Sequence, residues 1–387
     1  MTEWKEYKLG ELIKTNVKSI GRDYPYSKIL YLDTGSITCN NIDSFQEFEL
    51  DKAPSRAKRL VKQDDIIYSS VRPNQLHYGY ITNPQDNLVV STGFVTITCN
   101  KELLCPKFLY YFLIQSQITE YLHSVAEAST SAYPSLKPSD IEALDIEIPP
   151  LDTQRRIATI LSSLDDKIDL LHRENATLEQ MAETMFRQWF VEESKEEWEE
   201  ILLGNVVKTT SGGTPSRKHS EYYENGTINW VKSKELNGSF ISATEELITK
   251  EAMAKSSAKM LPEKSVLIAM YGATVGEYGI LSKPMTCNQA VCALIPNENY
   301  PYTYLYVWTA LMKEDFINLA SGAAQQNISQ DLIKQQIVCS DLDKIKQYDE
   351  MVRGYFEKME NNQKQIITLT ETRDGLLPRL MSGEIKL

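Results

Sequence analysis

The sequence predicts an α+β protein in which two similar globular regions are separated by two long antiparallel coiled-coil helices. Two observations predict this fold. A hydrophobic ladder with alternating steps of three and four residues runs through residues 151–190 and returns through residues 342–381, at a constant offset of 191 residues. Upstream, WKEYKLGELI from Trp4 aligns with WEEILLGNVV from Trp198, and HYGYI around Gly79 matches EYGIL around Gly279. The chain is therefore one architectural unit repeated twice.

Both ladders have the spacing of a heptad seam. A helix of about 33 residues is roughly 50 Å long, which is too long for the interior of a compact domain, so each helix is expected to be a spacer. Each helix buries its apolar stripe best against the other. The first ladder consists of Ile157, Leu161, Leu164, Ile168, Leu171, Asn175, Leu178, Ala182, Met185 and Trp189, and the second of Tyr348, Val352, Tyr355, Met359, Asn362, Ile366, Leu369, Arg373, Leu376 and Leu380.

The repeat also predicts how the helices are related. If the two copies pack through their helices about a pseudo-two-fold axis, the helices run antiparallel. Asp152 and Asp343 stand just before the ladders as expected N-caps. Asn175, Asn362 and Arg373 interrupt the seam, and two interpretations remain open. They fix the register of the pairing, or they are merely solvated near helix ends.

The two globular regions have the same order of elements. The first contains the β-rich runs ILYLDTGSI, DDIIYSS and LVVSTGFVTITC and then a helix at about 107–123. The second contains INWVKS, SVLIAMYG and AVCALIP and then a helix at about 302–319. We therefore predict a first globular domain over residues 1–150, a first long helix over 151–193, a second globular domain over 194–341, and a second long helix with a C-terminal tail over 342–387.

The composition is ordinary for a protein that stays in solution. The 387 residues are 42% hydrophobic and 24% charged, no apolar run reaches the roughly 18 residues that span a bilayer, and the N-terminus lacks an apolar signal core. We therefore expect a cytoplasmic protein without a membrane partner. The six cysteines show no CxxC spacing and no pairing with histidines, so no metal site is expected. The net charge of −12 argues against a chain that coats nucleic acid unaided.

The common catalytic motifs are missing from the sequence. It contains no GxxxxGK[ST] loop, no GxGxxG after a strand, no HExxH, no GxSxG and no Asn-Pro-Pro-aromatic tetrapeptide. Four scattered histidines provide little general acid-base chemistry. We therefore predict no catalytic residue and no cofactor in this chain.

What remains is a set of loops that mix cations, amides and aromatic residues, which are the residue types that contact phosphates and base edges. Each loop alone is more often solvated surface, but their occurrence in both copies favours DNA binding. The candidates are Arg22, Tyr26, Lys28, Arg56, Lys58, Arg59, Arg72, Asn74, Gln75, His77, Ser129, Thr130 and Tyr133 in the first region, and Arg217, Lys218, His219, Lys232, Lys234, Tyr271, Thr274, Gln325, Gln326 and Asn327 in the second.

Several stretches resemble signatures of the DNA-specificity subunit of Type I restriction-modification systems. They are WKEYKLGEL, TTSGGTPS, INWVKS and PPLDTQRRI, together with a degenerate second helix ending in LPRLMSGEI. The resemblance covers essentially the whole chain. It implies two target-recognition domains, each reading half of a split, asymmetric site in double-stranded DNA. It also implies paired helices that dock two methyltransferase subunits and, in the full enzyme, two restriction and translocase subunits.

The same resemblance implies that catalysis belongs to the partner subunits. S-adenosylmethionine would then bind to the methyltransferase subunits, and ATP and Mg to any nuclease partner. The second helix begins CSDLDKIKQYDEM where the first has PPLDTQRR, so the resemblance supports the first methyltransferase dock more strongly than the second.

Two other classes of protein remain open on the residues alone. A coiled-coil scaffold with two β-rich protein-interaction modules explains the ladders and the acidic charge, but not the matched basic loops. A stand-alone nuclease or methyltransferase with an atypical site is disfavoured by the missing motifs. Binding of random DNA, with and without methyltransferase subunits, distinguishes the three classes.

Overall fold

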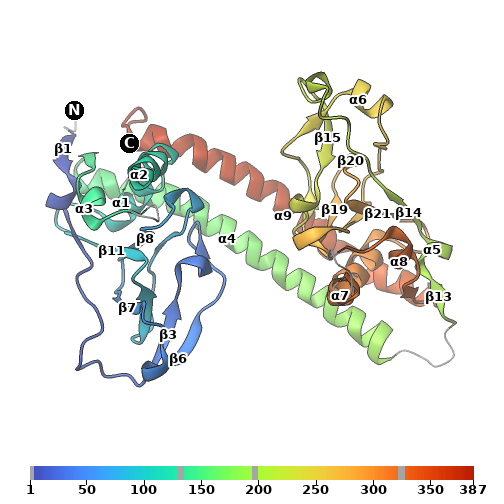
Figure 1. Ribbon diagram of the computed structural model, residues 1–387, viewed down its shortest axis with the longest axis horizontal. Coiled ribbons are helices and arrows are strands. Elements are labelled where there is room, and N and C mark those ends of the chain that lie inside the picture. Colours follow the sequence, from blue (N-terminus) through green and yellow to red (C-terminus); the bar gives the residue numbers. More distant parts are fainter. Residues whose placement is uncertain (1–3, 129–134, 194–198, 321–326) are drawn as a thin grey trace. The chain divides into compact units, whose positions relative to one another are not determined.

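The computed structural model describes residues 4–128, 135–193, 199–320 and 327–387 (Figure 1). The chain divides into two compact units. Unit 1 consists of Met1–Lys167 with Leu369–Leu387, and unit 2 consists of Ile168–Thr368. Each unit therefore combines one globular region with one segment of each long helix.

The globular part of unit 1 is built on two four-stranded sheets. The first consists, in spatial order, of β6 (Gln46–Glu49), β3 (Lys28–Leu32), β10 (Leu88–Ser91) and β7 (Ala57–Leu60). The second consists of β2 (Ile13–Thr15), β11 (Phe94–Cys99), β8 (Ile66–Ser69) and β9 (Tyr78–Tyr80). β3 and β10 are parallel neighbours, whereas the pairs of the second sheet are antiparallel.

Smaller elements complete unit 1. They are the antiparallel pair of β1 (Lys5–Lys8) and β12 (Asp145–Ile148), the pair of β4 (Ile37–Thr38) and β5 (Asn41–Ile42), and the helices α1 (Pro106–Leu113), α2 (Ser116–Glu127) and α3 (Pro138–Glu142). The single helix predicted at about 107–123 is therefore wrong, because two helices occupy this stretch and Gln115, in extended conformation, lies between them.

Unit 2 has the same plan with a five-stranded and a three-stranded sheet. The larger sheet consists of β14 (Lys208–Ser211), β21 (Val291–Ile295), β18 (Val266–Ala269), β19 (Tyr278–Leu281) and β16 (Phe240–Ile241). The smaller sheet consists of β17 (Leu247–Ile248), β15 (Ile228–Val231) and β20 (Thr286–Cys287). The other elements are the pair of β13 (Ile201–Leu202) and β22 (Ile337–Val338), and the helices α5 (Leu203–Val206), α6 (Lys250–Ala254), α7 (Tyr302–Ala320) and α8 (Gln330–Lys334).

The strand registers confirm the internal repeat. β8 pairs with β9 so that Ile67 faces Gly79, and β18 pairs with β19 so that Leu267 faces Gly279. The parallel pair of β3 and β10 has its counterpart in β15 and β20. A Cβ on Gly79 would lie 2.5 Å from Cδ1 of Ile37, so a larger residue at this position of β9 would require the Ile37 side chain to shift.

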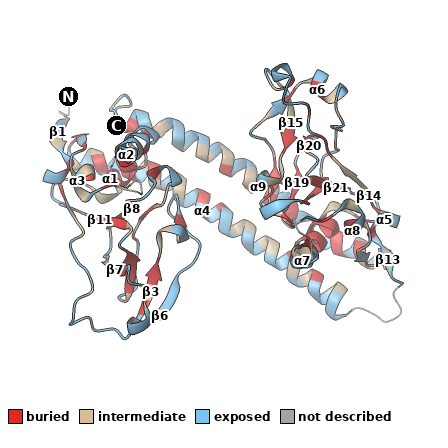
Figure 2. Ribbon diagram, viewed as in Figure 1, coloured by how far each residue is buried: buried red, intermediate tan, exposed pale blue. Residues whose placement is uncertain are grey.

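The ladders form the two long helices. α4 spans Leu151–Arg187 and continues into a π-helical turn, Gln188–Glu192, and α9 spans Leu342–Met381. Within each unit, residues on the ladder and beside it in both helices share a hydrophobic core with the sheets, as the buried positions in Figure 2 show. These residues include Ile157, Leu161, Leu377 and Leu380 in unit 1, and Ala182, Phe186, Tyr348 and Val352 in unit 2.

Polar residues cross the seam in both units. In unit 2, Nδ2 of Asn362 donates to Oδ1 of Asn175 over 2.8 Å and to a carboxylate oxygen of Glu174 over 2.9 Å. In unit 1, Nη1 of Arg373 donates to Oδ1 of Asp165 over 2.9 Å. Asn362 is fully buried, so the interpretation that it is merely solvated is wrong. These contacts fix which positions of the two helices face each other.

The helix starts differ from the predicted N-caps. Oδ1 of Asp341 accepts a hydrogen bond from the backbone N–H of Lys344 over 2.9 Å, so Asp341 and not Asp343 caps α9. Asp152 lies inside the first turn of α4, where it forms an ion pair with Arg155 at 3.1 Å. A carboxylate is favourable both at the cap and within the first turn, so composition alone does not separate the two positions.

We expect Asn362→Ala to lower the free energy of unfolding by about 1–3 kcal/mol, because it removes the fully buried amide that donates to Asn175 and Glu174. Thermal and denaturant unfolding of the full chain measures the change. Asn361→Ala is the matched control, because Asn361 is an exposed neighbour. Equal stability of the two variants would show that the amide contact adds nothing.

Candidate nucleic-acid interface

The structure brings several candidate loops of unit 1 together. An isolated β-bridge pairs Val71 with Ser135, and the N–H of Leu136 donates to the carbonyl of Ser70 over 2.7 Å. On the other side, the N–H of Ser70 donates to the carbonyl of Gly93 over 2.8 Å. Thus the segment after β8, the turn between β10 and β11, and the segment after α2 form one surface. We call this surface loop cluster 1, comprising residues 70–77, 92–93 and 135–136.

Unit 2 contains an equivalent surface. A β-bridge pairs Tyr271 with Asn327, and the N–H of Ile328 donates to the carbonyl of Met270 over 2.9 Å. The N–H of Met270 in turn donates to the carbonyl of Ala290 over 2.8 Å. We call this surface loop cluster 2, comprising residues 212–214, 270–274, 288–290 and 327–328. The two clusters are assembled from matching elements of the repeat.

The predicted base-reading residues of unit 1 lie in loop cluster 1 on an unusual backbone. Arg72, Asn74 and Gln75 are exposed on and beside a 3-10 turn, Pro73–Gln75. Arg72 has φ 47° and Leu76 has φ 59°, both in the left-handed region that non-glycine residues rarely adopt. Such strained residues persist only where surrounding contacts hold them, and they gather at binding sites.

Contacts with β4 and with Cys39, the residue that follows it, hold this backbone in place. Nδ1 of His77 lies 2.5 Å from the carbonyl oxygen of Ile37, and the N–H of Cys39 donates to the carbonyl of Leu76 over 2.9 Å. Because a carbonyl oxygen only accepts, His77 carries its proton on Nδ1 and offers Nε2 as an acceptor in the neutral ring.

The remaining candidates of unit 1 lie along β7 and the segment before β3. Residues 18–20 lie beside β7. An isolated β-bridge pairs Ser19 with Arg59, and the N–H of Ile20 donates to the carbonyl of Lys58. Arg56 joins this edge to loop cluster 1, because its carbonyl accepts from the N–H of Thr92 over 2.8 Å. Lys28 forms a 3.3 Å ion pair with Glu49, whereas Arg22 and Tyr26 are exposed.

The candidate cations of unit 2 are largely paired with acids. Arg217 lies 4.2 Å from the ring centre of Tyr223 and forms a 2.7 Å ion pair with Glu246. Lys232 contacts Glu245 and Glu246 at 2.9 and 3.2 Å. Lys234 also contacts Glu245, at 2.6 Å. These cations are therefore less available to phosphates than their positions in the sequence suggest. Lys218 is exposed and has no ion pair among the described residues.

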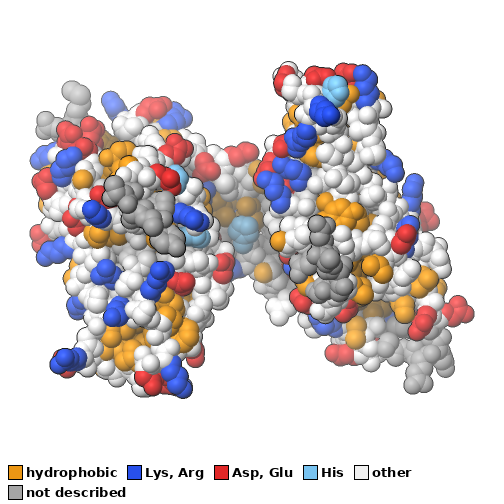
Figure 3. Space-filling view, in the orientation of Figure 1, with side chains coloured by type: hydrophobic (Ala, Val, Ile, Leu, Met, Phe, Trp, Pro, Cys, Tyr) orange, Lys and Arg blue, Asp and Glu red, His pale blue; other side chains and the backbone are white. Residues whose placement is uncertain are grey.

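The neighbouring cations lower the pKa of both carboxylates in this group. Desolvation alone would raise the pKa of Glu246, but its contacts with Arg217 and Lys232 hold that pKa below its usual value. Hydrogen bonds from Lys234 and Lys232 lower the pKa of Glu245. Both carboxylates are therefore charged at neutral pH, and the group is a compact network of opposite charges. Figure 3 shows that Lys and Arg side chains are interspersed with Asp and Glu side chains over the face in view.

The remaining candidates of unit 2 that the structure describes are not part of this charge network. Tyr271 is 44% exposed, and its carbonyl accepts from the hydroxyl of Thr274 within loop cluster 2. His219 is exposed, and its Nδ1 lies 2.8 Å from a carboxylate oxygen of Glu221. The candidates outside the described residues are Ser129, Thr130, Tyr133, Gln325 and Gln326.

Sequence reasoning missed the turn residues of both clusters. Thr92 lies in loop cluster 1, and Asn288 and Gln289 lie in loop cluster 2. The candidate loops were chosen because they contain cations, and neither of these turns contains one. The available signal is positional, since each turn precedes a strongly apolar strand, FVTITC or VCALI, at the same place in the repeat.

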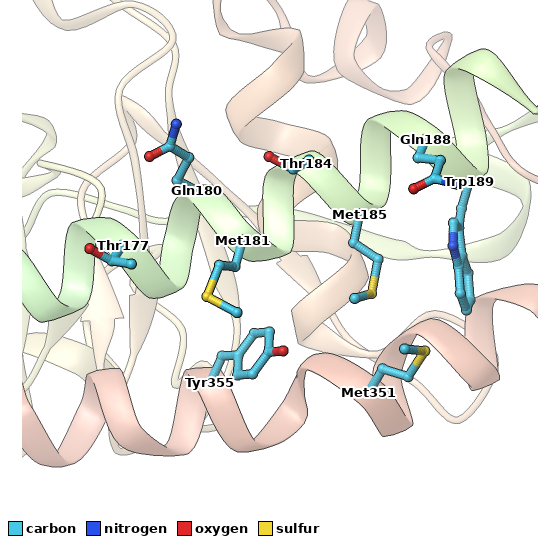
Figure 4. Close-up of a pocket in the computed structure, with 9 residues that line it drawn as sticks. All are labelled: Thr177, Gln180, Met181, Thr184, Met185, Gln188, Trp189, Met351 and Tyr355. Atoms are coloured by element: carbon cyan, nitrogen blue, oxygen red, sulfur yellow. The ribbon is translucent and has the colours of Figure 1, made fainter.

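A groove on the helix segments of unit 2 is a separate candidate surface. It encloses about 520 Å³, and Figure 4 shows Met181, Met185 and Trp189 extending toward α9 and Tyr355 extending toward α4. Met181 is 46% exposed and Met351 is 52% exposed. Flexible, polarisable methionine side chains on a helical surface are typical of protein-binding grooves.

The family model of the Type I restriction modification DNA specificity domain matches residues 1–180 and 195–339, so the chain belongs to this family. It is similar to the HindI specificity subunit of Haemophilus influenzae, with 28% identity and full coverage of both chains. It is also similar to the MjaIX specificity subunit of Methanocaldococcus jannaschii, with 25% identity over 100% of this chain and 97% of the relative.

A solved structure shows the same fold. The crystal structure of the Type-I restriction-modification system S subunit from M. genitalium aligns with a TM-score of 0.60 at 17% identity, covering 98% of this chain and 96% of that chain. The family match makes the chain a DNA-specificity subunit. Its family is non-catalytic, and catalysis belongs to partner subunits, so family membership confirms the prediction that this chain is not itself an enzyme.

Within the described residues, no helix has the length and apolar character to cross a membrane. In the same part of the chain, no cluster of three or more His, Cys, Asp or Glu side chains is arranged to hold a metal ion.

Proposed function

We propose that loop clusters 1 and 2 each read one half of a split, asymmetric site in double-stranded DNA. The observation that carries this proposal is the assembly of the same segments in both units, through the bridges Val71–Ser135 and Tyr271–Asn327. The target-recognition domains are then residues 1–150 and 194–341, and the spacers are residues 151–193 and 342–387. The clusters differ in their side chains, so the two half-sites differ in sequence.

Base reading falls to side chains that offer paired hydrogen bonds. Arg72, Asn74 and Gln75 in loop cluster 1 can each present two groups to a guanine or adenine edge. In unit 2 this role falls to Arg217, Gln325 and Gln326. Lys58 and Lys218 act only as point charges on phosphates, because an ammonium group has no acceptor and no planar fork.

The helices are the dock for two methyltransferase subunits. Exposed methionines beside Trp189 and Tyr355 provide an adaptable apolar surface on α4 and α9 of unit 2, and this surface supports one of the docks. S-adenosylmethionine binds to these partners, and ATP and Mg bind to restriction and translocase subunits where the system has them. The assembled complex acts in the cytoplasm, where its DNA lies.

Docking predicts a selective binding defect. Met181→Glu combined with Met351→Glu should weaken binding of the methyltransferase subunit of the same system by about 30-fold or more, because a desolvated contact contributes about 2 kcal/mol or more. Calorimetric titration of the purified subunits measures the change. Met260→Glu is the matched control, since Met260 is 44% exposed elsewhere in unit 2. Unchanged affinity of the double variant would place the dock elsewhere.

The test of the proposed function is selection from random duplex DNA by the full chain with and without its methyltransferase subunits. We expect weak binding by the acidic chain alone and enrichment of one two-part sequence by the complex. Tight, specific binding by the chain alone at physiological salt would contradict the expected dependence on partners. Binding of the partners without enrichment of any sequence would favour a protein-interaction scaffold instead.

A further inference from the structure

The turn that joins β20 to β21, residues 288–290, lies in the middle of loop cluster 2. The backbone N–H of Asn288 donates to the carbonyl of Val231 over 2.9 Å, and the carbonyl of Ala290 accepts from the N–H of Met270 over 2.8 Å. Other loops of unit 2 are thus attached to the turn on either side of Gln289. The side chain of Gln289 is exposed between these two attachment points.

The turn is also held by its own hydrogen bonds. Oδ1 of Asn288 accepts from the N–H of Ala290 over 3.1 Å, and the carbonyl of Asn288 accepts from the N–H of Val291 over 3.3 Å. The backbone around Gln289 is therefore already ordered before any ligand binds. This lowers the conformational entropy lost when the Gln289 side chain engages a ligand.

A second segment orients the amide of Gln289. The hydroxyl of Thr214 donates to Oε1 of Gln289, and two glycines bring Thr214 there. A Cβ on Gly212 would lie 1.9 Å from the carbonyl oxygen of Cys287, and the N–H of Gly213 donates to that oxygen over 2.9 Å. Nε2 of Gln289 has no hydrogen bond to any residue that the structure describes. The Gln289 side chain can therefore donate from Nε2 and can accept a second hydrogen bond at Oε1.

We propose that Gln289 is a specificity-determining residue that reads an adenine in the half-site of unit 2, with Thr214 as its positioning residue. Nε2 donates to N7 of the base and Oε1 accepts from its N6 amino group, a pattern that adenine presents in the major groove. This inference rests on the proposed function, because it takes loop cluster 2 as a DNA-reading surface.

The corresponding turn of unit 1 supports the assignment to one half-site. Thr92 occupies the equivalent place between β10 and β11, and its N–H is bound to the carbonyl of Arg56. A threonine hydroxyl can form a hydrogen bond with any of several base types, so it selects weakly. A glutamine amide forms two hydrogen bonds in a fixed arrangement that matches adenine. The two units therefore read DNA differently at this position.

The test is selection from duplex DNA randomised across the recognised site, using the full chain assembled with its own methyltransferase subunits. Gln289→Ala should reduce the preference for adenine at one position of one half-site by about 5- to 150-fold and leave every other position unchanged. Gln289→Glu should shift that position toward cytosine, because a carboxylate accepts from the N4 amino group but cannot donate to N7. Gln335→Ala, at an exposed site after α8, is the matched control.

Thr214 is tested separately from Gln289. Thr214→Val keeps the shape and removes the hydroxyl, so it should reduce the same adenine preference by a smaller factor, and Thr214→Ser should restore it. A merely structural role would instead weaken binding to all sequences alike or lower the melting temperature, without a change in base preference. That result would remove Thr214 from the proposal.

The outcomes for Gln289 separate this inference from the function on which it rests. If the unsubstituted complex enriches no sequence, the proposed function fails. If that complex is specific but Gln289→Ala keeps every preference, or loses preference at a position that is not adenine, the reading role of Gln289 is overturned and the proposed function stands.

Discussion

Leu161→Asp should destabilise the protein by about 4 kcal/mol or more and abolish the cooperative melting of unit 1. Leu161 is fully buried in α4, in the same core as Leu377 and Leu380 of α9. A carboxylate at this position loses its hydration among the apolar side chains that the structure describes in this core, which is among the most destabilising single changes. Differential scanning calorimetry of the full chain measures the effect.

Thr159→Asp is the matched control for this substitution. Thr159 lies on the same helix two residues earlier and is exposed, so the same new charge stays in water. We expect its melting temperature to stay within a few degrees of the unsubstituted chain, as for most surface changes of about 0.5 kcal/mol or less. If Leu161→Asp melts like Thr159→Asp, the helices do not form part of the core of unit 1.

Lengthening both helices by one heptad should lengthen the gap between the two half-sites and leave their sequences unchanged. Seven residues inserted after Leu170 in α4 and seven after Ile367 in α9 preserve the seam, because a heptad returns each ladder to the same face. The insertion adds about 10 Å at about 1.5 Å per residue, which corresponds to about three base pairs at about 3.4 Å each.

Sequencing of methylated DNA from cells that carry the altered complex reads out the gap. Three base pairs also turn the duplex by about a third of a turn, so we expect a lower methylation rate along with the longer gap. An insertion in α4 alone is the control, since the two helices then cannot keep both the Asn175–Asn362 contact and the Asp165–Arg373 contact in register, which should disrupt assembly. An unchanged gap with altered bases would show that the recognition domains and not the helices set the spacing.

Much of the helix geometry could be predicted from the sequence, because a heptad pattern reports directly on which residues face the partner. Leu151 and Leu342 begin the helices where the ladders predict. The choice of cap was wrong for α9, because Asp341 and Asp343 are chemically alike and only the backbone conformation decides between them. The repeat likewise predicted the matching order of strands. It did not predict that two helices, α1 and α2, replace the single helix expected at about 107–123 in unit 1.

The site was predicted less completely, because a sequence does not show what faces a charged side chain. Lys232 and Arg217 are cations on candidate loops, yet Glu246 lies far from Arg217 in the sequence and contacts both in the fold. Gln289 illustrates the opposite error. It lies in an uncharged turn that hydrogen bonds of Asn288, Ala290 and Thr214 connect to the other loops of unit 2.

A methylation map of Arg72→Ala, compared with that of Lys58→Ala, tests the central claim most directly. The claim is that each unit reads its own half of the site. Arg72→Ala should relax the bases of one half-site by about 1–3 kcal/mol and leave the other half-site unchanged. Lys58→Ala should weaken methylation of all sequences alike and reduce the salt dependence by about one phosphate contact. Equal loss of preference at both half-sites from Arg72→Ala would contradict the claim.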